Sequence, residues 1–429
     1  MRPPRFFNFY LRRRYGRGKE PYDPRTHLFR VLKPVYGHPV SGRWWAMTFL
    51  TYLVDTLGFQ QSDFHPCFFV RPEADGTPTI LITVVDNVPL AGQDHHVAAV
   101  RAALDNRFVM TWDERADDVC GLYFDYSSDG SILVHQKPYI AKVLAHLGIP
   151  SVLDGPVTPL HEKFHVDPNA EDFVDASTAD YDTPAIDHRE AIGLLMYLRP
   201  TVPAMSRAVH VLATATNIWQ SKHARALLRI GLWLAANQND TGVFFSAVYR
   251  GRFELRAFVD ESLGCDLSRN GHGVALSRLG GFLLLNGGCI CSASHRAAAT
   301  CYSTAEIALL AISLLVRRFV PIRRLLHLAN GVPVLRTDLR CDNQPVLKQL
   351  RRRQLSPQMR RFRIAMNGIL AAEDSYDVIC KYIRSKINPA NTFTSPAARA
   401  LFCRAQRRLH HRSARPHSTR LHHAHRRRS

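Results

Sequence analysis

Residues 253–266 read FELRAFVDESLGCD, and this segment decides the fold that the sequence predicts. Apolar side chains alternate with charged ones from Phe253 to Ala257, and two further apolar residues precede Asp260, which is a pattern typical of a β-strand. We therefore expect a strand that ends on an acidic residue and that opens a domain extending to about residue 396.

The elements that follow this strand predict an α/β domain. Short strands with glycine turns recur over 243–290, and Gly287-Gly288 indicates a hairpin. Strands followed by alternating strand and helix favour a mixed sheet with helices packed on it. The remaining elements are a helix over about 304–316, a strand over about 334–339, a further helix, and a last strand near 378–383.

Two further segments each offer an acidic side chain at the edge of an apolar element. In YSTAEIALLAISLLV, residues 302–316, Glu306 opens an apolar helix, where a charge is costly unless it faces a site. In VLRTDLRCDNQPVL, residues 334–347, Asp342 follows a strand and precedes a helix. A two-metal nuclease needs carboxylates that converge on ions about 3.5–4 Å apart, and magnesium prefers such oxygen ligands.

Each acid also has a structural interpretation that requires no metal. Asp260 could be a solvated strand end, Glu306 could favour a helix N-terminus through the dipole, and Asp342 could be a helix N-cap. For any one acid alone the structural interpretation is favoured. The three acids together, in this order and on these elements, favour a metal site.

Five segments of the second half carry a resemblance to a known family. They are Val259–Asp266, Gly287–Ser294, Ala305–Ala311, Cys341–Gln344 and Tyr382–Ser395. Together they resemble the ribonuclease H domain of copia-type LTR retrotransposon polyproteins, whose C-D-N-Q motif is intact here. The resemblance implies that Asp260, Glu306 and Asp342 are metal ligands and that Asn391 stands where the family has a fourth acid.

The first half extends this resemblance toward the reverse transcriptase of the same polyproteins. The matching segments are Leu32–Gly37, Arg43–Trp45, Asp63–Phe69, Val84–Asn87 and Arg189–Pro200. The resemblance places Asp86 and Asn87 at the two palm carboxylates, so that Asp86 would bind metal and Asn87 would not. A buried strand aspartate that is paired locally is the favoured interpretation of Asp86, because the family's fingers and first palm aspartate have no counterpart before Leu32.

The resemblance covers residues 28–396 and implies a fold class of α+β and α/β, with a partial reverse-transcriptase palm and thumb before a ribonuclease H-like mixed sheet with helices. The expected organisation is a basic disordered lead-in over 1–26, a partial palm over 27–168, a linker and helical connection over 169–245, a ribonuclease H-like domain over 246–398, and a disordered Arg/His-rich tail over 399–429.

Composition narrows the class of partner. The net charge of +20, from 56 Lys+Arg against 36 Asp+Glu, favours a polyanion such as nucleic acid, although the basic tails alone could set this balance. Nine cysteines without a CxxC pair argue against a disulfide framework and for a reducing compartment. No secretory signal or transmembrane run is visible, so we expect an intracellular location, in a cytoplasmic particle or the nucleus, and no membrane partner.

The sequence therefore predicts an RNA-directed DNA polymerase and ribonuclease H fragment that uses Mg²⁺ or Mn²⁺. Its expected partners are an RNA–DNA hybrid, a template–primer and other parts of the retrotransposon polyprotein. We expect polymerase activity to be absent and hybrid cleavage to be impaired, because Asn87 and Asn391 each replace a carboxylate. The alternatives are a non-catalytic nucleic-acid-binding remnant and a non-functional relic of the element.

Overall fold

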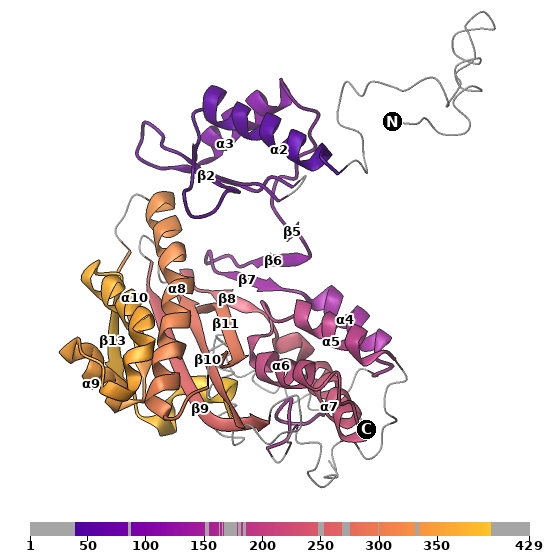
Figure 1. The fold of residues 1–429 in the computed structure, drawn as a ribbon. Helices are drawn as coiled ribbons and strands as arrows, with labels where there is room; N and C mark the ends of the chain where they lie inside the picture. The colour runs from indigo at the N-terminus through magenta and orange to yellow at the C-terminus, as the bar shows by residue number, and fades with distance from the viewer. Residues whose placement is uncertain are drawn as a thin grey trace, which may run out of the picture. The chain divides into compact units, whose positions relative to one another are not determined.

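The computed structural model describes residues 39–84, 87–150, 154–162, 164, 166, 178, 182, 186–247, 253–267, 275–298, 300–330 and 334–395. The predicted lead-in over 1–26, the tail over 399–429 and Asp86 lie outside these residues. The chain divides into two compact units, residues 1–111 and 112–429 (Figure 1). The predicted segment boundaries at 168, 245 and 398 stay predictions. Within the described part, no helix combines the length and the apolar character that crossing a membrane requires.

The first unit contains a small antiparallel sheet and helices. The sheet order is β1 (Gln60–Gln61), β2 (Phe68–Arg71), β3 (Thr79–Ile82) and β4 (Leu90–Ala91). The helices are α2 (Ser41–Thr51), which continues as the π-helix η1 (Tyr52–Thr56), and α3 (Asp94–Asp105). The helical segment ends just before Gly58, whose φ of 72° is a conformation that favours glycine at the C-terminus of a helix.

Residues 79–88 have the apolar, β-branched composition of a buried strand, but only the first four of them form one. It ends at Ile82, because the chain reverses just beyond it. Val84 N–H donates to the Asn87 carbonyl at 2.8 Å, and Asn87 N–H donates to the Val84 carbonyl at 2.9 Å. These paired hydrogen bonds form an isolated antiparallel bridge between the two residues.

The second unit begins with a four-stranded antiparallel sheet and a helical layer. The strands, in sheet order, are β5 (Asp118–Val119), β6 (Leu122–Tyr126), β7 (Ile132–His135) and β8 (Val243–Phe245). The helices are α4 (Lys137–His146), α5 (His188–Tyr197), α6 (Ser206–Thr214) and α7 (Ser221–Asn237), with short 3-10 turns η3 (Pro203–Met205) and η4 (Gln238–Asp240). Helix α7 is buried along most of its length, as its apolar sequence predicts.

A mixed five-stranded sheet follows, which confirms the predicted mixed sheet with helices. Its order is β11 (Gly288–Arg296), β10 (Ala275–Leu285), β9 (Leu255–Leu267), β12 (Thr337–Cys341) and β13 (Val378–Tyr382). Strands β9, β10 and β11 are antiparallel, whereas β12 runs parallel to both β9 and β13. The associated helices and turns are α8 (Thr304–Asn330), α9 (Gln344–Arg352), η6 (Pro357–Phe362), α10 (Arg363–Asp374), η7 (Ser385–Ile387) and η8 (Pro389–Phe393).

Helices cover both faces of this sheet. On one face, β9 residues Leu255, Ala257 and Val259 pack in a core with helices α8 and α10 (Figure 1). On the other face, Phe258 and Phe282 join the core of the helical layer that includes α6 and α7. The alternation in β9 explains this arrangement, because successive side chains of a strand point to opposite faces.

Three element boundaries differ from their predictions. Strand β9 continues to Leu267, so Asp260 lies inside the strand and not at its end. Helix α8 extends to Asn330 and not to 316, with Pro321 inside it. Leu285 pairs with Gly288, so the hairpin turn is Asn286-Gly287 and Gly288 belongs to the strand. Asn286 and Gly287 both have positive φ, as a two-residue type I′ turn requires.

The turn η8 packs on the sheet so closely that it leaves no room for a side chain at Gly280. A Cβ atom at Gly280 would lie 2.7 Å from Phe393 Cβ and 2.8 Å from Thr394 Cγ2. We expect Gly280→Ala to lower the free energy of unfolding by about 1–3 kcal/mol, which is the usual effect of overpacking a core. Urea unfolding followed by circular dichroism measures this change.

Gly193→Ala is the matched control, because the space around Gly193 in α5 is open. Alanine there should stabilise the helix by up to about 1 kcal/mol. If both variants have the same urea midpoint as the unaltered protein, η8 does not pack against Gly280 as closely as described.

Candidate metal centre

Two adjacent acidic residues of β9 lie where the central strands separate. Strand β9 pairs with β12 only from Arg256 to Phe258, and the two strands are no longer paired beyond that point. Asp260 and Glu261 follow directly, and both line a cavity of about 480 Å³. Asp260 is buried and Glu261 is half-buried.

The end of β12 adds Asp342 to the same cavity. The adjacent Asn343, and not Asp342, is the N-cap of α9, because its Oδ1 accepts a hydrogen bond from Val346 N–H at 3.1 Å. The same side chain donates through Nδ2 to Glu261 Oε1 at 2.7 Å. The N-cap interpretation of Asp342 is therefore wrong, and this carboxylate is left to face the cavity.

The turn η8 completes the wall with Asn391. Asn391 Nδ2 donates to the Ser385 carbonyl at 3.1 Å. Its Oδ1 is buried and has no hydrogen-bond partner in the described structure, and the same is true of Glu261 Oε2. Two buried oxygens without donors in one cavity are unusual, because buried polar atoms are normally satisfied.

The cavity is therefore lined mostly by oxygen-bearing side chains. Its full lining is Asp260, Glu261, Ser262, Thr304, Asp342, Asn343, Gln344, Pro345, Ser385, Asn391 and Ser395. The possible ligand atoms of Glu261, Asp342 and the buried Cys341 lie within 4.8 Å of one another.

Burial and mutual repulsion favour the protonated forms of the two β9 acids. The pKa of Asp260 is raised to about 7, chiefly by burial and also by repulsion from Asp342, against the opposing effect of a hydrogen bond from Thr394. Burial also raises the pKa of Glu261 to about 8, with repulsion from Asp260 and Asp342, against the hydrogen bond from Asn343. A divalent cation would remove this conflict by neutralising the charges.

The donor set fits a hard divalent cation. Asp260, Glu261 and Asp342 offer carboxylate oxygens, and Asn391 offers the unpartnered Oδ1, which are ligand types that Mg²⁺ and Mn²⁺ accept. Burial raises the pKa of the Cys341 thiol well above its ordinary value, so it stays protonated and is a poor ligand. The residues that would hold the ion are therefore the three acids and Asn391.

Glu306 has a different environment from the one that the resemblance implies. It is buried near the start of α8, and its Oε2 accepts hydrogen bonds from Arg361 at 2.6 Å and from Tyr302 N–H at 2.9 Å. Glu306 is not among the residues that line the cavity, although Thr304 of the same helix is. The structure thus brings Asp260, Asp342 and Asn391 together and pairs Glu306 with an arginine, and its role as a ligand stays a prediction.

The residues at 86 and 87 belong to the other unit of the chain. Asp86 lies outside the described residues, so its predicted role as a metal ligand stays a prediction. Asn87 forms an isolated bridge with Val84.

Glu261 is an acidic residue of the cavity that the sequence analysis did not predict. Strict alternation along a strand would point its side chain to the opposite face from Asp260.

Comparisons with known proteins give a structural similarity over part of the chain. No protein-family model and no curated protein matches the chain. Among solved structures, the chain is similar to the crystal structure of RNase H1 from the halophilic archaeon Halobacterium salinarum NRC-1, with 19% sequence identity and a TM-score of 0.25. The match covers 33% of this chain and 94% of that chain. The similarity is one of fold and identifies neither a reverse transcriptase nor a copia-type element.

The raised pKa values predict how stability depends on pH without metal. The folded-state pKa values of Asp260 and Glu261, about 7 and about 8, exceed their ordinary values, so the folded protein retains protons that the unfolded chain releases. Their contribution is fully present below about pH 4 and is lost as the pH rises through about 8. We expect the free energy of unfolding in EDTA to fall over this interval, by up to about 1.4 kcal/mol per pH unit for each proton.

A bound metal ion should reverse the loss of stability at high pH, because the cation takes the place of the protons on Asp260 and Glu261. At about pH 8.5, MnCl₂ or MgCl₂ should raise the melting temperature, and it should do so much less at about pH 5.5. The Asp260→Asn/Glu261→Gln variant should lose both the pH dependence and the metal effect. A metal effect that is equal in the variant and in the unaltered protein would place the ion elsewhere.

Proposed function

We propose that residues 246–398 form a ribonuclease H-like, metal-dependent domain that binds RNA–DNA hybrids and cleaves them slowly. The cavity where β9 and β12 separate carries this proposal, because three carboxylates and an amide oxygen converge on it. The motif resemblance to copia-type retrotransposon polyproteins supplies the nucleic-acid substrate. It also supplies the inference that the chain derives from the reverse transcriptase and ribonuclease H part of such a polyprotein.

The chemistry is hydrolysis of an RNA phosphodiester. Bound Mg²⁺ or Mn²⁺ would lower the pKa of a water molecule and stabilise the negative charge that develops on the phosphate. Asp260 and Asp342 would position the ion, and Asn343 would hold Glu261 in place through the 2.7 Å hydrogen bond. Thr394 would keep the Asp260 side chain in its orientation through their hydrogen bond.

Two features favour weak activity. Asn391 contributes an oxygen without the negative charge that an aspartate would give. Glu306 is held in an ion pair with Arg361, at 2.6 Å between Arg361 Nη2 and Glu306 Oε2. Each feature reduces the negative charge available to a cation, so the ion should bind less tightly than in a site with four free acids.

Polymerase activity is not part of the proposal. The resemblance assigns the palm carboxylates to Asp86 and Asn87, and an asparagine at the second position removes a metal-binding charge. We therefore propose that the part of the chain before residue 246 has kept the family's sequence pattern without its chemistry.

The cleavage assay uses a labelled RNA–DNA hybrid with Mg²⁺ or Mn²⁺. We expect slow cleavage by the unaltered protein and none by Asp342→Asn, because the amide removes a ligand charge. Asn391→Asp should cleave at least about ten-fold faster, equivalent to about 1.4 kcal/mol of added transition-state stabilisation. Gel separation of the RNA products gives the rates.

Asp338→Asn is the matched control, because Asp338 lies on β12 but pairs with Lys381 and Arg340 outside the cavity. It should cleave at the rate of the unaltered protein. If the unaltered protein cuts no faster than Asp342→Asn, the enzymatic proposal fails.

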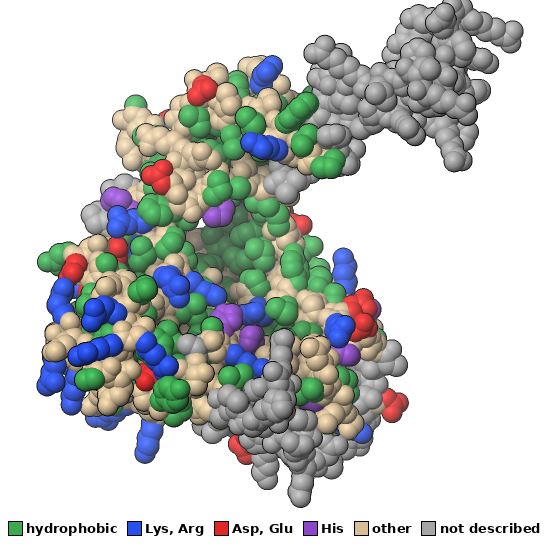
Figure 2. Space-filling model, viewed as in Figure 1, with side chains coloured by type: hydrophobic (Ala, Val, Ile, Leu, Met, Phe, Trp, Pro, Cys, Tyr) green, Lys and Arg blue, Asp and Glu red, His purple; other side chains and the backbone are tan. Residues whose placement is uncertain are grey.

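A basic surface favours a second candidate function, nucleic-acid binding without catalysis. Figure 2 shows Lys and Arg side chains gathered over the face formed by α9 and α10. We define the basic surface by five exposed residues of α9, η6 and α10, namely Lys348, Arg351, Arg352, Arg360 and Arg363. Helix α9 contributes both to this surface and to the cavity, because Gln344 and Pro345 at its start line the cavity.

Salt dependence tests this surface. Replacing Lys348, Arg351 and Arg352 with glutamine should weaken hybrid binding and reduce the slope of log K against log salt by up to about 3, at about one per lost phosphate contact. Fluorescence anisotropy at several salt concentrations measures the slope. An unchanged slope would exclude the basic surface as the phosphate contact.

The same assay separates the two functions. Binding that survives replacement of Asp260, Glu306 and Asp342 by alanine, without cleavage by the unaltered protein, would favour the binding function.

A further inference from the structure

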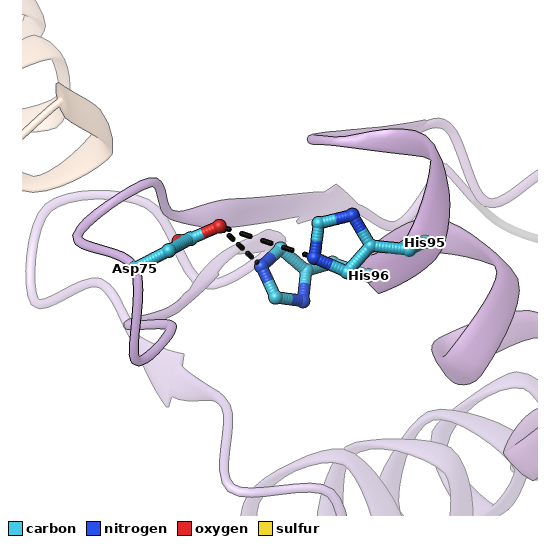
Figure 3. A group of neighbouring side chains, drawn as sticks. All are labelled: Asp75, His95 and His96. Atoms are coloured by element: carbon cyan, nitrogen blue, oxygen red, sulfur yellow. Dashed lines mark hydrogen bonds and ion pairs between the residues drawn. The ribbon is translucent and has the colours of Figure 1, made fainter.

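A second cluster of metal-binding side chains lies in the first unit, independent of the function proposed above. It consists of Asp75, in the turn between β2 and β3, and of His95 and His96, in the first turn of α3 (Figure 3). One possible ligand atom from each residue lies within 4.8 Å of the others. All three residues belong to the same compact unit, so their arrangement depends on that unit alone.

Both imidazole rings face one carboxylate oxygen (Figure 3). His96 Nε2 lies 2.9 Å from Asp75 Oδ2, and His95 Nε2 lies 3.9 Å from the same oxygen. Ligands about 2.1 Å from a tetrahedral zinc ion lie about 3.4 Å from one another. The two measured distances lie on either side of this value, so a small rotation of the exposed His95 ring would complete the geometry.

The Asp75 carboxylate is oriented by the loop that carries it. Thr77 donates two hydrogen bonds to Asp75 Oδ1, from its backbone N–H at 2.9 Å and from its hydroxyl at 2.6 Å. These bonds, with the contact to His96, hold the pKa of Asp75 well below its ordinary value. Oδ1 is therefore used by the loop, and Oδ2 is presented to the two histidines.

Glu73 orients the His96 ring from the opposite side. Glu73 Oε2 lies 3.6 Å from His96 Nδ1. Glu73 Oε1 accepts hydrogen bonds from Arg71 Nε at 2.8 Å and from the Thr79 hydroxyl at 2.5 Å. A carboxylate behind one ring nitrogen is the usual support of a metal-binding histidine, because it fixes the tautomer and turns the other nitrogen toward the ion.

We propose that Asp75 Oδ2, His95 Nε2 and His96 Nε2 bind a divalent transition-metal ion of the zinc, cobalt or nickel class, with Glu73 as a positioning residue. Two imidazole nitrogens favour this class over magnesium, which prefers oxygen ligands. The ion replaces the proton that joins His96 to Asp75. It links the β2–β3 turn to α3, and the exposure of His95 leaves a fourth position open to water.

Cobalt binding to the full-length, reduced protein tests this site. Titration with CoCl₂, followed by visible absorption and calorimetry, should show one equivalent fewer for His95→Gln/His96→Gln than for the unaltered protein. The other histidines and cysteines of the chain contribute equally to both proteins, so only the difference counts. Glu73→Gln should keep the equivalent but bind it about 10–100-fold more weakly.

His65→Gln and Asp63→Asn are the controls, because both residues lie in the same unit outside the cluster. They should bind cobalt like the unaltered protein. Equal cobalt stoichiometry in the double variant and the unaltered protein overturns the proposal.

A second measurement uses only the unaltered protein, so its result does not depend on whether the double variant folds. In protein labelled at the alanine methyl groups, one equivalent of Co²⁺ should shift or broaden the signals of Ala74, which precedes Asp75, and of Ala98, which lies two residues after His96. Unchanged Ala74 and Ala98 signals at that ratio also overturn the proposal.

Discussion

The docking of residues 388–395 onto the mixed sheet is the interaction on which the candidate metal centre depends. Buried Asn388 donates through Nδ2 to the Val259 carbonyl at 2.8 Å, and the buried Ser294 hydroxyl donates to the Phe393 carbonyl at 2.6 Å. Thr394 then reaches Asp260. Gly280 stands directly opposite Asp260 in the sheet, and its missing side chain leaves the space that this segment occupies. Without this docking Asn391 would not reach the cavity, and Asp260 would lose the hydroxyl that orients it.

Electrostatics divides the acids of the second unit into two groups. No ion pair joins Asp260 or Glu261 to a cation among the described residues, and burial and mutual repulsion raise their pKa values. Glu306 is equally buried, but it has the guanidinium of Arg361 as a partner. A bound cation would relieve the repulsion between Asp260 and Glu261, whereas Glu306 already has Arg361 as a cationic partner. This contrast explains why the geometry supports metal binding by the β9 acids more strongly than by Glu306.

Local sequence patterns predicted the positions of strands and helices more accurately than they predicted which side chains contact one another. The apolar pattern before Asp260 and the strand before Asp342 were sufficient to predict the mixed sheet, but they placed Asp260 at the end of its strand, whereas it lies inside β9. Glu261 could not be found in this way, because it reaches the cavity only where β9 and β12 separate. The pairing of Glu306 with Arg361 joins residues 55 positions apart, so helical periodicity contains no sign of it. The Asn286-Gly287 turn, in contrast, was visible as an Asn-Gly pair and was displaced by one residue in the prediction.

The two-sided packing of the mixed sheet bears on how the second unit can be divided. Phe258, Phe282 and Phe393 belong to the same core as Trp233 and the other buried residues of the helical layer. Strand β8 also ends only ten residues before β9 begins and pairs with β7 far upstream. A fragment that started at residue 246 would leave this aromatic face in contact with water, and such faces promote aggregation. Any fragment of this chain that is meant to fold around the mixed sheet therefore has to include the helices from α4 onward, because these helices cover the aromatic face of the sheet.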